Sequence, residues 1–220
     1  MRSVVLKSSV RCPRCQLPLR WCVCAEHREV TCPLEIDVLM HHRERFRPSS
    51  TGNLIQRVIP ASRQHVWRRE RKLAVDEIQV PGRKLWILHP QGELVPDLPP
   101  PEHVQILLLD GSWRETSAIA QELRGWGRLV NLPMTGESRY WLREQTDTAR
   151  FSTAEALLFL LKSFGLHEAQ KAFRRQFELH VYASLRARGH KEQAREFLVN
   201  SPIAAVFADL IAQLNVRRSR

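Results

Sequence analysis

The chain alternates between short apolar runs typical of buried strands and longer stretches in which apolar residues recur at helical spacing. The clearest run, Ile106 to Leu109, is long enough for a strand buried on both faces and too short for a helix. A polar turn that begins at Asp110 ends it, and a helical pattern begins at Trp113. In α/β proteins this succession places a ligand outside the carboxyl end of the strand.

Two interpretations of this turn stand side by side. Asp110 can present its carboxylate to a ligand, next to a Gly111 that lets another backbone or a ligand approach closely. Alternatively, Asp110 and Ser112 cap the following helix and Trp113 fills the core. These residues alone do not separate the two interpretations.

The other apolar runs predict an α/β protein with a largely parallel sheet, because strands alternate with helices along the chain. We expect further strands at Glu35 to Met40, Leu85 to His89 and Gly127 to Leu132. Thr51 is expected to cap one helix, and Ser152 or Thr153 another. The final third is helical, with helices at Glu168 to Arg188, Lys191 to Val199 and Ile203 to Asn215.

Four of the five cysteines lie close together near the start of the chain, with the spacing C-x2-C-x6-C-x-C. A pair two residues apart forms the usual zinc-knuckle turn, and four thiolates make a structural site with no open position for chemistry. We therefore predict zinc bound by Cys12, Cys15, Cys22 and Cys24. Two disulfides or four free thiols are the alternatives. Cys32 is expected to be a small apolar residue.

The charge balance indicates a class of partner. The chain has 34 Lys and Arg against 23 Asp and Glu, a net charge of +11. Such a field favours a polyanion such as RNA, and Arg suits phosphates and stacked bases. The densest basic stretch, from 63 to 72, includes Trp67, which suits base stacking, although a solvated charged face fits equally well. Its candidate RNA contacts are Arg63, Arg68, Arg69, Arg71 and Lys72.

No segment predicts export or membrane insertion. Val4 to Leu6 is far too short for the apolar part of a signal peptide. The longest apolar run, Ala156 to Leu161, cannot span a bilayer. We therefore expect a soluble, cytoplasmic protein without membrane partners. The motifs of P-loop, dinucleotide-binding, zinc-protease and serine-hydrolase sites are absent from the sequence.

Five groups of residues follow one another between residues 12 and 156. They are the cysteine cluster with Pro18, Ser50-Thr51-Gly52-x-Leu54-Ile55, Leu109-Asp110-Gly111-Ser112-Trp113, Tyr140-x-Leu142-Arg143 and Ser152-Thr153-Ala154-Glu155-Ala156. In this order they resemble the DTW-domain family of tRNA-uridine aminocarboxypropyltransferases. The name motif of that family is Asp-Thr-Trp, usually with Gly after Asp. Here Ser112 replaces the Thr and keeps its hydroxyl, so we expect tuned function rather than loss.

The resemblance also implies a fold. The family is similar to SPOUT methyltransferases, whose mostly parallel α/β domain has its C-terminal part tied into a trefoil knot around S-adenosylmethionine. We therefore expect three parts, which are a zinc knuckle over residues 1–32, a SPOUT-like catalytic domain over 33–165, and a helical extension over 166–220 that packs on it.

The implied reaction is transfer of a 3-amino-3-carboxypropyl group from S-adenosylmethionine to N3 of a uridine in tRNA, with release of methylthioadenosine. The uridine imide must lose its proton, so a carboxylate is the natural base and Asp110 is the candidate. Holding the ammonium of S-adenosylmethionine is its alternative duty. Arg143 is a candidate for RNA phosphate or the cofactor carboxylate, or it forms an ion pair with Glu155. The expected cofactor contacts are Thr51, Gly52, Leu109, Gly111, Ser112, Trp113, Leu132, Ser152 and Thr153.

Two other classes remain open. A SPOUT-type RNA methyltransferase would use the same cofactor and fold, whereas a non-enzymatic zinc-knuckle RNA-binding protein would have no use for Asp110. The uridine needs an aromatic platform, for which Trp67, Tyr140 and Trp141 are equal candidates. We expect tRNA as the partner and a monomer as the active form, with a homodimer as the alternative.

Overall fold

The computed structural model describes residues 10–143 and 151–216 of the chain. Its centre is a five-stranded parallel sheet with the strand order β2-β1-β4-β3-β5. The strands are β1 (Glu35–His41), β2 (Arg63–Trp67), β3 (Lys84–Leu94), β4 (Val104–Asp110) and β5 (Arg128–Asn131). The predicted α/β class and parallel sheet are thus confirmed, and the run that ends at Asp110 is the central strand.

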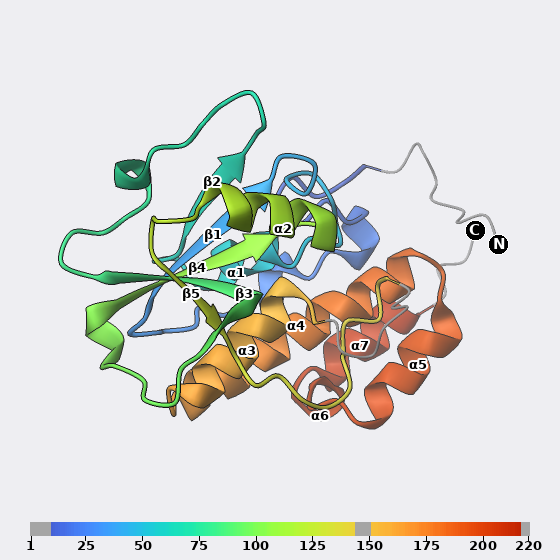
Figure 1. Cartoon of the computed structure of the whole chain (residues 1–220). Coiled ribbons are helices and arrows are strands. Elements are labelled where there is room, and N and C mark those ends of the chain that lie inside the picture. Colours follow the sequence, from blue (N-terminus) through green and yellow to red (C-terminus); the bar gives the residue numbers. More distant parts are fainter. Residues whose placement is uncertain (1–9, 144–150, 217–220) are drawn as a thin grey trace.

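Helices cover both faces of the sheet (Figure 1). The side chains of β4 alternate between the faces, as the two-residue period of a strand requires. Ile106 and Leu108 share one core with the helices below the sheet in the figure, whereas Leu107 and Leu109 share a second core with the helix above it. The lower helices are α1 (Gly52–Val58), α3 (Thr153–Ser163) and α4 (His167–Ala187), and the upper one is α2 (Trp113–Glu122).

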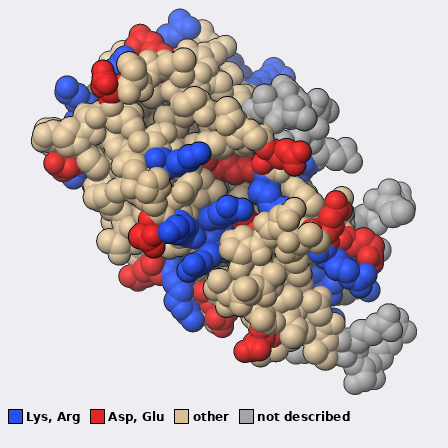
Figure 2. Space-filling view, turned by 90° about the horizontal axis from the view of Figure 1, so that it is seen from below, with Lys and Arg blue, Asp and Glu red and all other residues tan. Residues whose placement is uncertain are grey.

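The C-terminal third is helical, as predicted. After α4 come α5 (Lys191–Val199), α6 (Ile203–Val206) and α7 (Ala208–Asn215), so the last predicted helix is broken at Phe207. Phe173 and Phe177 of α4 are buried in the lower core, which extends from Leu17 near the start of the chain to Leu214. On the face seen from below, basic side chains gather in the middle with acidic ones beside them (Figure 2).

Two predicted elements need correction. The stretch from 63 to 72 was interpreted only as a basic surface, but its first half is the edge strand β2, paired with β1. The strand predicted at Leu85 to His89 continues to Leu94 as part of β3, with an irregularity in its pairing between Leu88 and Glu93. The sequence also predicts a polar loop between Arg143 and Arg150, and residues 144–150 lie outside the described part of the chain. The trefoil knot stays a prediction.

Among the described residues, no helix combines the length and the apolar character that crossing a membrane requires.

Asp37 on β1 is the ion-pair partner of Arg63, the first basic residue of the stretch from 63 to 72. Its carboxylate is fully buried and accepts two hydrogen bonds from the Arg63 guanidinium, at 2.9 and 2.7 Å, and another from Gln105. Burial raises the pKa of Asp37, but the nearby His65, at 3.6 Å, and the hydrogen bonds from Arg63 and Gln105 outweigh it, so the pKa is lowered. Arg63 therefore ties β2 to β1.

We expect Asp37→Asn to lower the free energy of unfolding at pH 7 by roughly 3 kcal/mol, because it removes the buried and closest charge partner of Arg63 and leaves only the pair with Glu35 at 3.8 Å. A carboxyl whose pKa is depressed by folding stabilises above its unfolded pKa and loses this effect as the pH falls through the folded value. The difference between wild type and variant should therefore shrink below about pH 4. Urea denaturation at pH 7 and pH 3.5 measures it, and a pH-independent difference would contradict the assignment.

Candidate functional site

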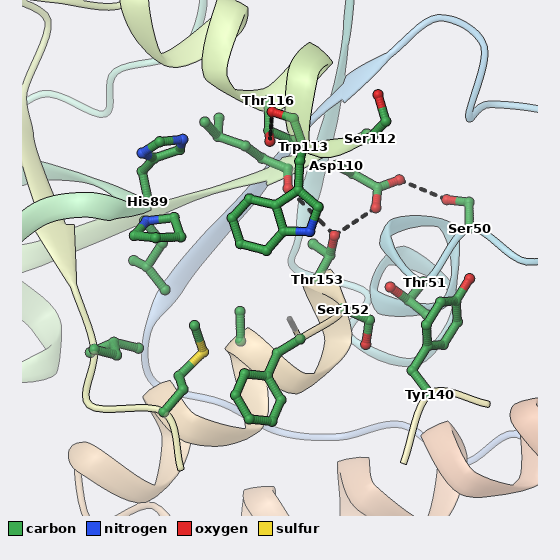
Figure 3. A pocket seen from close by; sticks show the side chains of 18 of the residues that line it. Ser50, Thr51, His89, Asp110, Ser112, Trp113, Thr116, Tyr140, Ser152 and Thr153 are labelled. Atoms are coloured by element: carbon green, nitrogen blue, oxygen red, sulfur yellow. Dashed lines mark hydrogen bonds between the residues drawn. The ribbon is translucent and has the colours of Figure 1, made fainter. Parts of the chain in front are cut away.

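The carboxyl ends of β4 and β5 and the middle of β3 open into a cavity of about 440 Å³, which is in the size range of small-molecule sites (Figure 3). Its wall also includes the loop before α1 and the start of α3. Segments about a hundred residues apart in the chain thus meet here. Of the residues expected at the cofactor or the reaction, it is lined by Thr51, Leu109, Asp110, Gly111, Ser112, Trp113, Leu132, Arg143, Ser152 and Thr153.

Asp110 ends β4 and is 5% exposed. One carboxylate oxygen accepts a hydrogen bond from the Ser50 hydroxyl at 2.8 Å, and the other accepts from the Thr153 hydroxyl at 2.6 Å (Figure 3). One hydroxyl comes from the loop before α1 and the other from the first residue of α3. A side-chain carbon at Gly52 would lie 2.8 Å from the carboxyl carbon, so α1 can approach Asp110 only with glycine there. Gly52 supports the site from behind Asp110.

The turn after β4 separates the two sequence interpretations. Ser112 caps α2, because its hydroxyl accepts from the Glu115 N–H and the Glu115 carboxylate accepts from the Ser112 N–H. Serine and threonine both serve as caps, which explains why Ser112 can replace the expected threonine. Asp110 does not cap the helix. Trp113 is 37% exposed and its ring points into the cavity, so it does not fill the core (Figure 3).

Two residues predicted as helix caps, Thr51 and Ser152, line the cavity together with Asp110. Ser152 caps α3 through a reciprocal pair with Glu155. Thr51 precedes α1, but the predicted capping by its side chain is wrong, because its hydroxyl accepts the N–H of Ala154 in the first turn of α3 at 3.2 Å. This bond joins the loop before α1 to the start of α3. It therefore fixes the positions of Ser50 and Thr153, whose hydroxyls bond Asp110, relative to each other.

Arg143 reaches the cavity as part of an ion-pair network. Its guanidinium donates to Glu44 at 2.9 Å, and Arg47 also pairs with Glu44, so the predicted pair with Glu155 is not the one formed. Glu44 is 1% exposed; burial raises the pKa of its carboxyl, and Asp110 raises it further against the effect of Arg143. The site therefore presents the Asp110 carboxylate and a guanidinium that is 38% exposed in its side chain, whereas the buried Glu44 holds Arg143 from outside the lining.

Sequence reasoning missed several residues of the site. Ser50 directly precedes Thr51 in the motif Ser50-Thr51-Gly52, and its hydroxyl group makes it a candidate donor to Asp110. His89 and Pro90 line the cavity at the end of the first straight part of β3. The argument that led from a strand end to Asp110 applies equally to His89, because parallel strands end at the same edge. Glu44 has no comparable signal in the sequence.

The four clustered cysteines come together as predicted. Their sulfurs lie within 4.8 Å of one another, with 3.9 Å between Cys12 and Cys24 and 3.7 Å between Cys15 and Cys22. Tetrahedral zinc with bonds of about 2.3 Å separates its sulfurs by about 3.8 Å, so the group can hold such an ion. Hydrogen bonding with Cys24 lowers the pKa of Cys15 to about 5, which favours a thiolate. Cys32 lies apart and packs against the apolar core.

The basic stretch lies away from the cavity lining. Arg63 is bound to Asp37, and Arg71 forms an ion pair with Glu77 at 2.7 Å, whereas the other three candidate RNA contacts are exposed, namely Arg68, Arg69 and Lys72. Trp67, one of the three candidate platforms, is 8% exposed and its indole N–H donates to Glu122, which leaves little of its ring open for stacking on a base.

The other two candidate platforms are also engaged. The buried Tyr140 donates its hydroxyl to the Ser49 carbonyl at 2.6 Å, and Trp141 packs edge-on against Phe197. The aromatic side chains that line the cavity are those of Trp113, Tyr140 and Phe151, and the Trp113 ring points into it.

The chain belongs to the DTW domain family, because the family model matches residues 9–185 and so covers most of it. The match includes the cysteine cluster and every segment that lines the cavity. No solved structure matches the chain.

Proposed function

We propose that the protein transfers a 3-amino-3-carboxypropyl group from S-adenosylmethionine to N3 of a uridine in tRNA, with release of methylthioadenosine. The DTW family supports this reaction in general. The observation that carries it for this chain is the cavity at the strand ends, where the buried carboxylate of Asp110 is held by two hydroxyls beside the guanidinium of Arg143.

The residues present fit S-adenosylmethionine chemically. Its methionine end carries an ammonium and a carboxylate, for which Asp110 and Arg143 are suitable partners. Its adenine is a flat ring, which suits Trp113 and the apolar side chains of Leu109 and Leu132. We propose these roles together with polar contacts from the turn at Gly111 and Ser112 and from the hydroxyls of Ser152 and Thr153.

S-adenosylmethionine supplies a sulfonium that activates every carbon bonded to its sulfur, so orientation selects the carbon that reacts. In our proposal Asp110 accepts the proton from uridine N3. The bond from N3 to the methionine Cγ then forms as the Cγ–S bond breaks, and the electron pair stays on sulfur in the neutral thioether. Ser50 and Thr153 keep the carboxylate pointed at the acceptor, which is the positioning that such a transfer needs.

The remaining expectations belong to the same proposal. A trefoil knot in the C-terminal part of the sheet would explain why loops from distant parts of the chain meet at one cavity. Zinc would occupy the four-cysteine group, and the exposed Arg68, Arg69 and Lys72 would contact RNA. The active form would be a monomer in the cytoplasm.

Nucleoside mass spectrometry tests the proposal. Bulk tRNA from a strain that lacks the protein is incubated with purified protein and S-adenosylmethionine, digested and analysed together with the free methylthioadenosine. We expect a uridine heavier by the aminocarboxypropyl group and methylthioadenosine in equal amount. A methylated nucleoside with S-adenosylhomocysteine would instead establish a methyltransferase. No modified nucleoside in tRNA or ribosomal RNA would favour a binding protein.

A further inference from the structure

A second hollow, of about 560 Å³, lies outside the candidate site, and we call it the basic pocket. Four of the residues that line it are cations, contributed by three separate parts of the chain. Arg20 and Trp21 come from a short turn of 3₁₀ helix, Arg186 from the last turn of α4, and Lys191 and Arg195 from one face of α5.

The pocket is built around the ring of Trp21. The guanidinium of Arg20 lies 4.9 Å from the ring centre and that of Arg186 lies 5.1 Å from it. Cation–π contacts of this kind hold an arginine in place without neutralising it. Trp21 stands directly before Cys22, so the four-cysteine group fixes the segment that carries this ring. Two guanidinium groups are therefore preorganised with their charge available.

The charges of the pocket are weakly compensated within the described residues. Arg186 and Lys191 form no ion pair there, and the Nε of Arg186 is buried without a hydrogen-bond partner. Arg195 pairs with Glu192, but both side chains are about 80% exposed, and such a pair contributes little. Four like charges around one hollow repel each other unless an anion binds among them.

The basic pocket and the candidate site are linked through the C-terminal end of α4. Arg188, two residues beyond Arg186, donates a hydrogen bond to the carbonyl of Leu142. Leu142 directly precedes Arg143, which lines the cavity with Asp110. A chain of phosphates that crosses the basic pocket can therefore continue toward the site of reaction.

We propose that the basic pocket binds the phosphate backbone of the substrate RNA and so docks it beside the cavity that receives the uridine. This inference rests on the proposed function, because it takes RNA as the substrate. It gives the N-terminal cysteine group a part in substrate binding, since that group places Arg20 and Trp21. It also assigns RNA docking to a surface different from the stretch between residues 63 and 72.

The test is a pair of charge reversals matched in spacing and charge. Lys191→Glu/Arg195→Glu alters the pocket, and Lys171→Glu/Arg175→Glu alters α4 at the same four-residue spacing; all four side chains are exposed. Arg195 forms an ion pair with Glu192, three residues before it, and Lys171 forms the corresponding pair with Glu168. Binding of fluorescent tRNA without S-adenosylmethionine is measured by anisotropy at several salt concentrations, and thermal melting verifies that both variants fold.

We expect the pocket variant to bind tRNA at least about tenfold more weakly and to lower the salt slope of log affinity by about two, one for each lost phosphate contact. The control should change affinity by less than about threefold, as a diffuse field effect does. Equal losses in both variants would overturn the inference, and so would unchanged binding in the pocket variant.

Two further readouts keep this result separate from the proposed function. If wild type modifies no RNA but the pocket variant alone loses tRNA binding, the result supports RNA docking at the basic pocket and refutes the proposed reaction. If the pocket variant binds and modifies tRNA like wild type, the result supports the proposed reaction and refutes RNA docking at the basic pocket. Displacement of tRNA by polyglutamate at equal charge would identify an acidic protein as the partner and overturn the inference.

Discussion

Replacement of Asp110 by Asn should lower the rate of group transfer by about two to four orders of magnitude, the usual contribution of a positioned acid or base. Asparagine keeps the shape of the side chain and can still bond the hydroxyls of Ser50 and Thr153, which lie 2.8 and 2.6 Å from the carboxylate. It cannot accept a proton from uridine. The loss should therefore fall on the catalytic rate constant, with little change in stability.

The two duties open to Asp110 predict different kinetics. As the base, Asp110 acts on the rate, and the dissociation constant of S-adenosylmethionine should change by less than about threefold in Asp110→Asn. As the partner of the ammonium, it contributes roughly 1.5–3 kcal/mol to binding, which is about ten- to a hundredfold in that constant. Calorimetric titration of S-adenosylmethionine and single-turnover transfer to tRNA, measured on the same preparation, separate the two.

Asp37→Asn is the matched control for this experiment. Both residues are buried aspartates on neighbouring strands, but Asp37 pairs with Leu107 in the register and so lies three residues behind Asp110 along the sheet. The control should lower stability without lowering the rate of the folded enzyme. Full transfer activity in Asp110→Asn would refute the role assigned to this carboxylate in either form.

The apolar pattern predicted most of the fold because the sheet is buried on both faces. Strands such as β4 are continuous apolar runs, and the long amphipathic helix α4 begins and ends within one residue of its predicted limits. Asp110 was found for the same reason, since a charged residue directly after such a run must lie at the strand's end. The cysteine cluster followed from spacing alone.

What the sequence did not reveal depends on partners distant in the chain. Arg63 looked like a free cation until β2 was placed beside Asp37, and Trp67 looked like a platform until Glu122 accepted its N–H. Ser50 was visible in its motif, but that its hydroxyl faces Asp110, sixty residues later, follows only from the fold. Local patterns predict elements, whereas these contacts arise from their packing.

Removal of zinc should destabilise the chain by on the order of 5 kcal/mol, because binding energy at a structural zinc site is largely folding energy. For a chain of this length that corresponds to a fall in Tm of about 10–20 °C. Cys12, Cys15 and Cys24 are buried and belong to the same core as Leu17 and the C-terminal helices. Removal of the metal should therefore destabilise this whole core.

The charge around the cysteines fits an occupied site. Four thiolates and one zinc ion carry a net charge of −2, and the partly buried Arg57 of α1 lies next to them, where it donates to the Arg14 carbonyl at 3.1 Å. Burial lowers the pKa of Arg57, and the neighbouring Cys24 and Cys15 oppose this effect. Without the metal and its thiolates, this guanidinium would lose its compensating charge, which adds to the expected destabilisation.

Metal analysis should find one zinc ion per chain in wild type and much less in Cys24→Ser, and thermal melting with and without a strong chelator gives the stability. Cys32→Ser is the control, because Cys32 is partly buried but lies outside the four-cysteine group. The chelator should lower the Tm of the control as it does that of wild type. Because Trp21 adjoins Cys22, zinc loss should also weaken tRNA binding through the basic pocket. A zinc-free wild type with unchanged Tm would show that the four thiols need no metal.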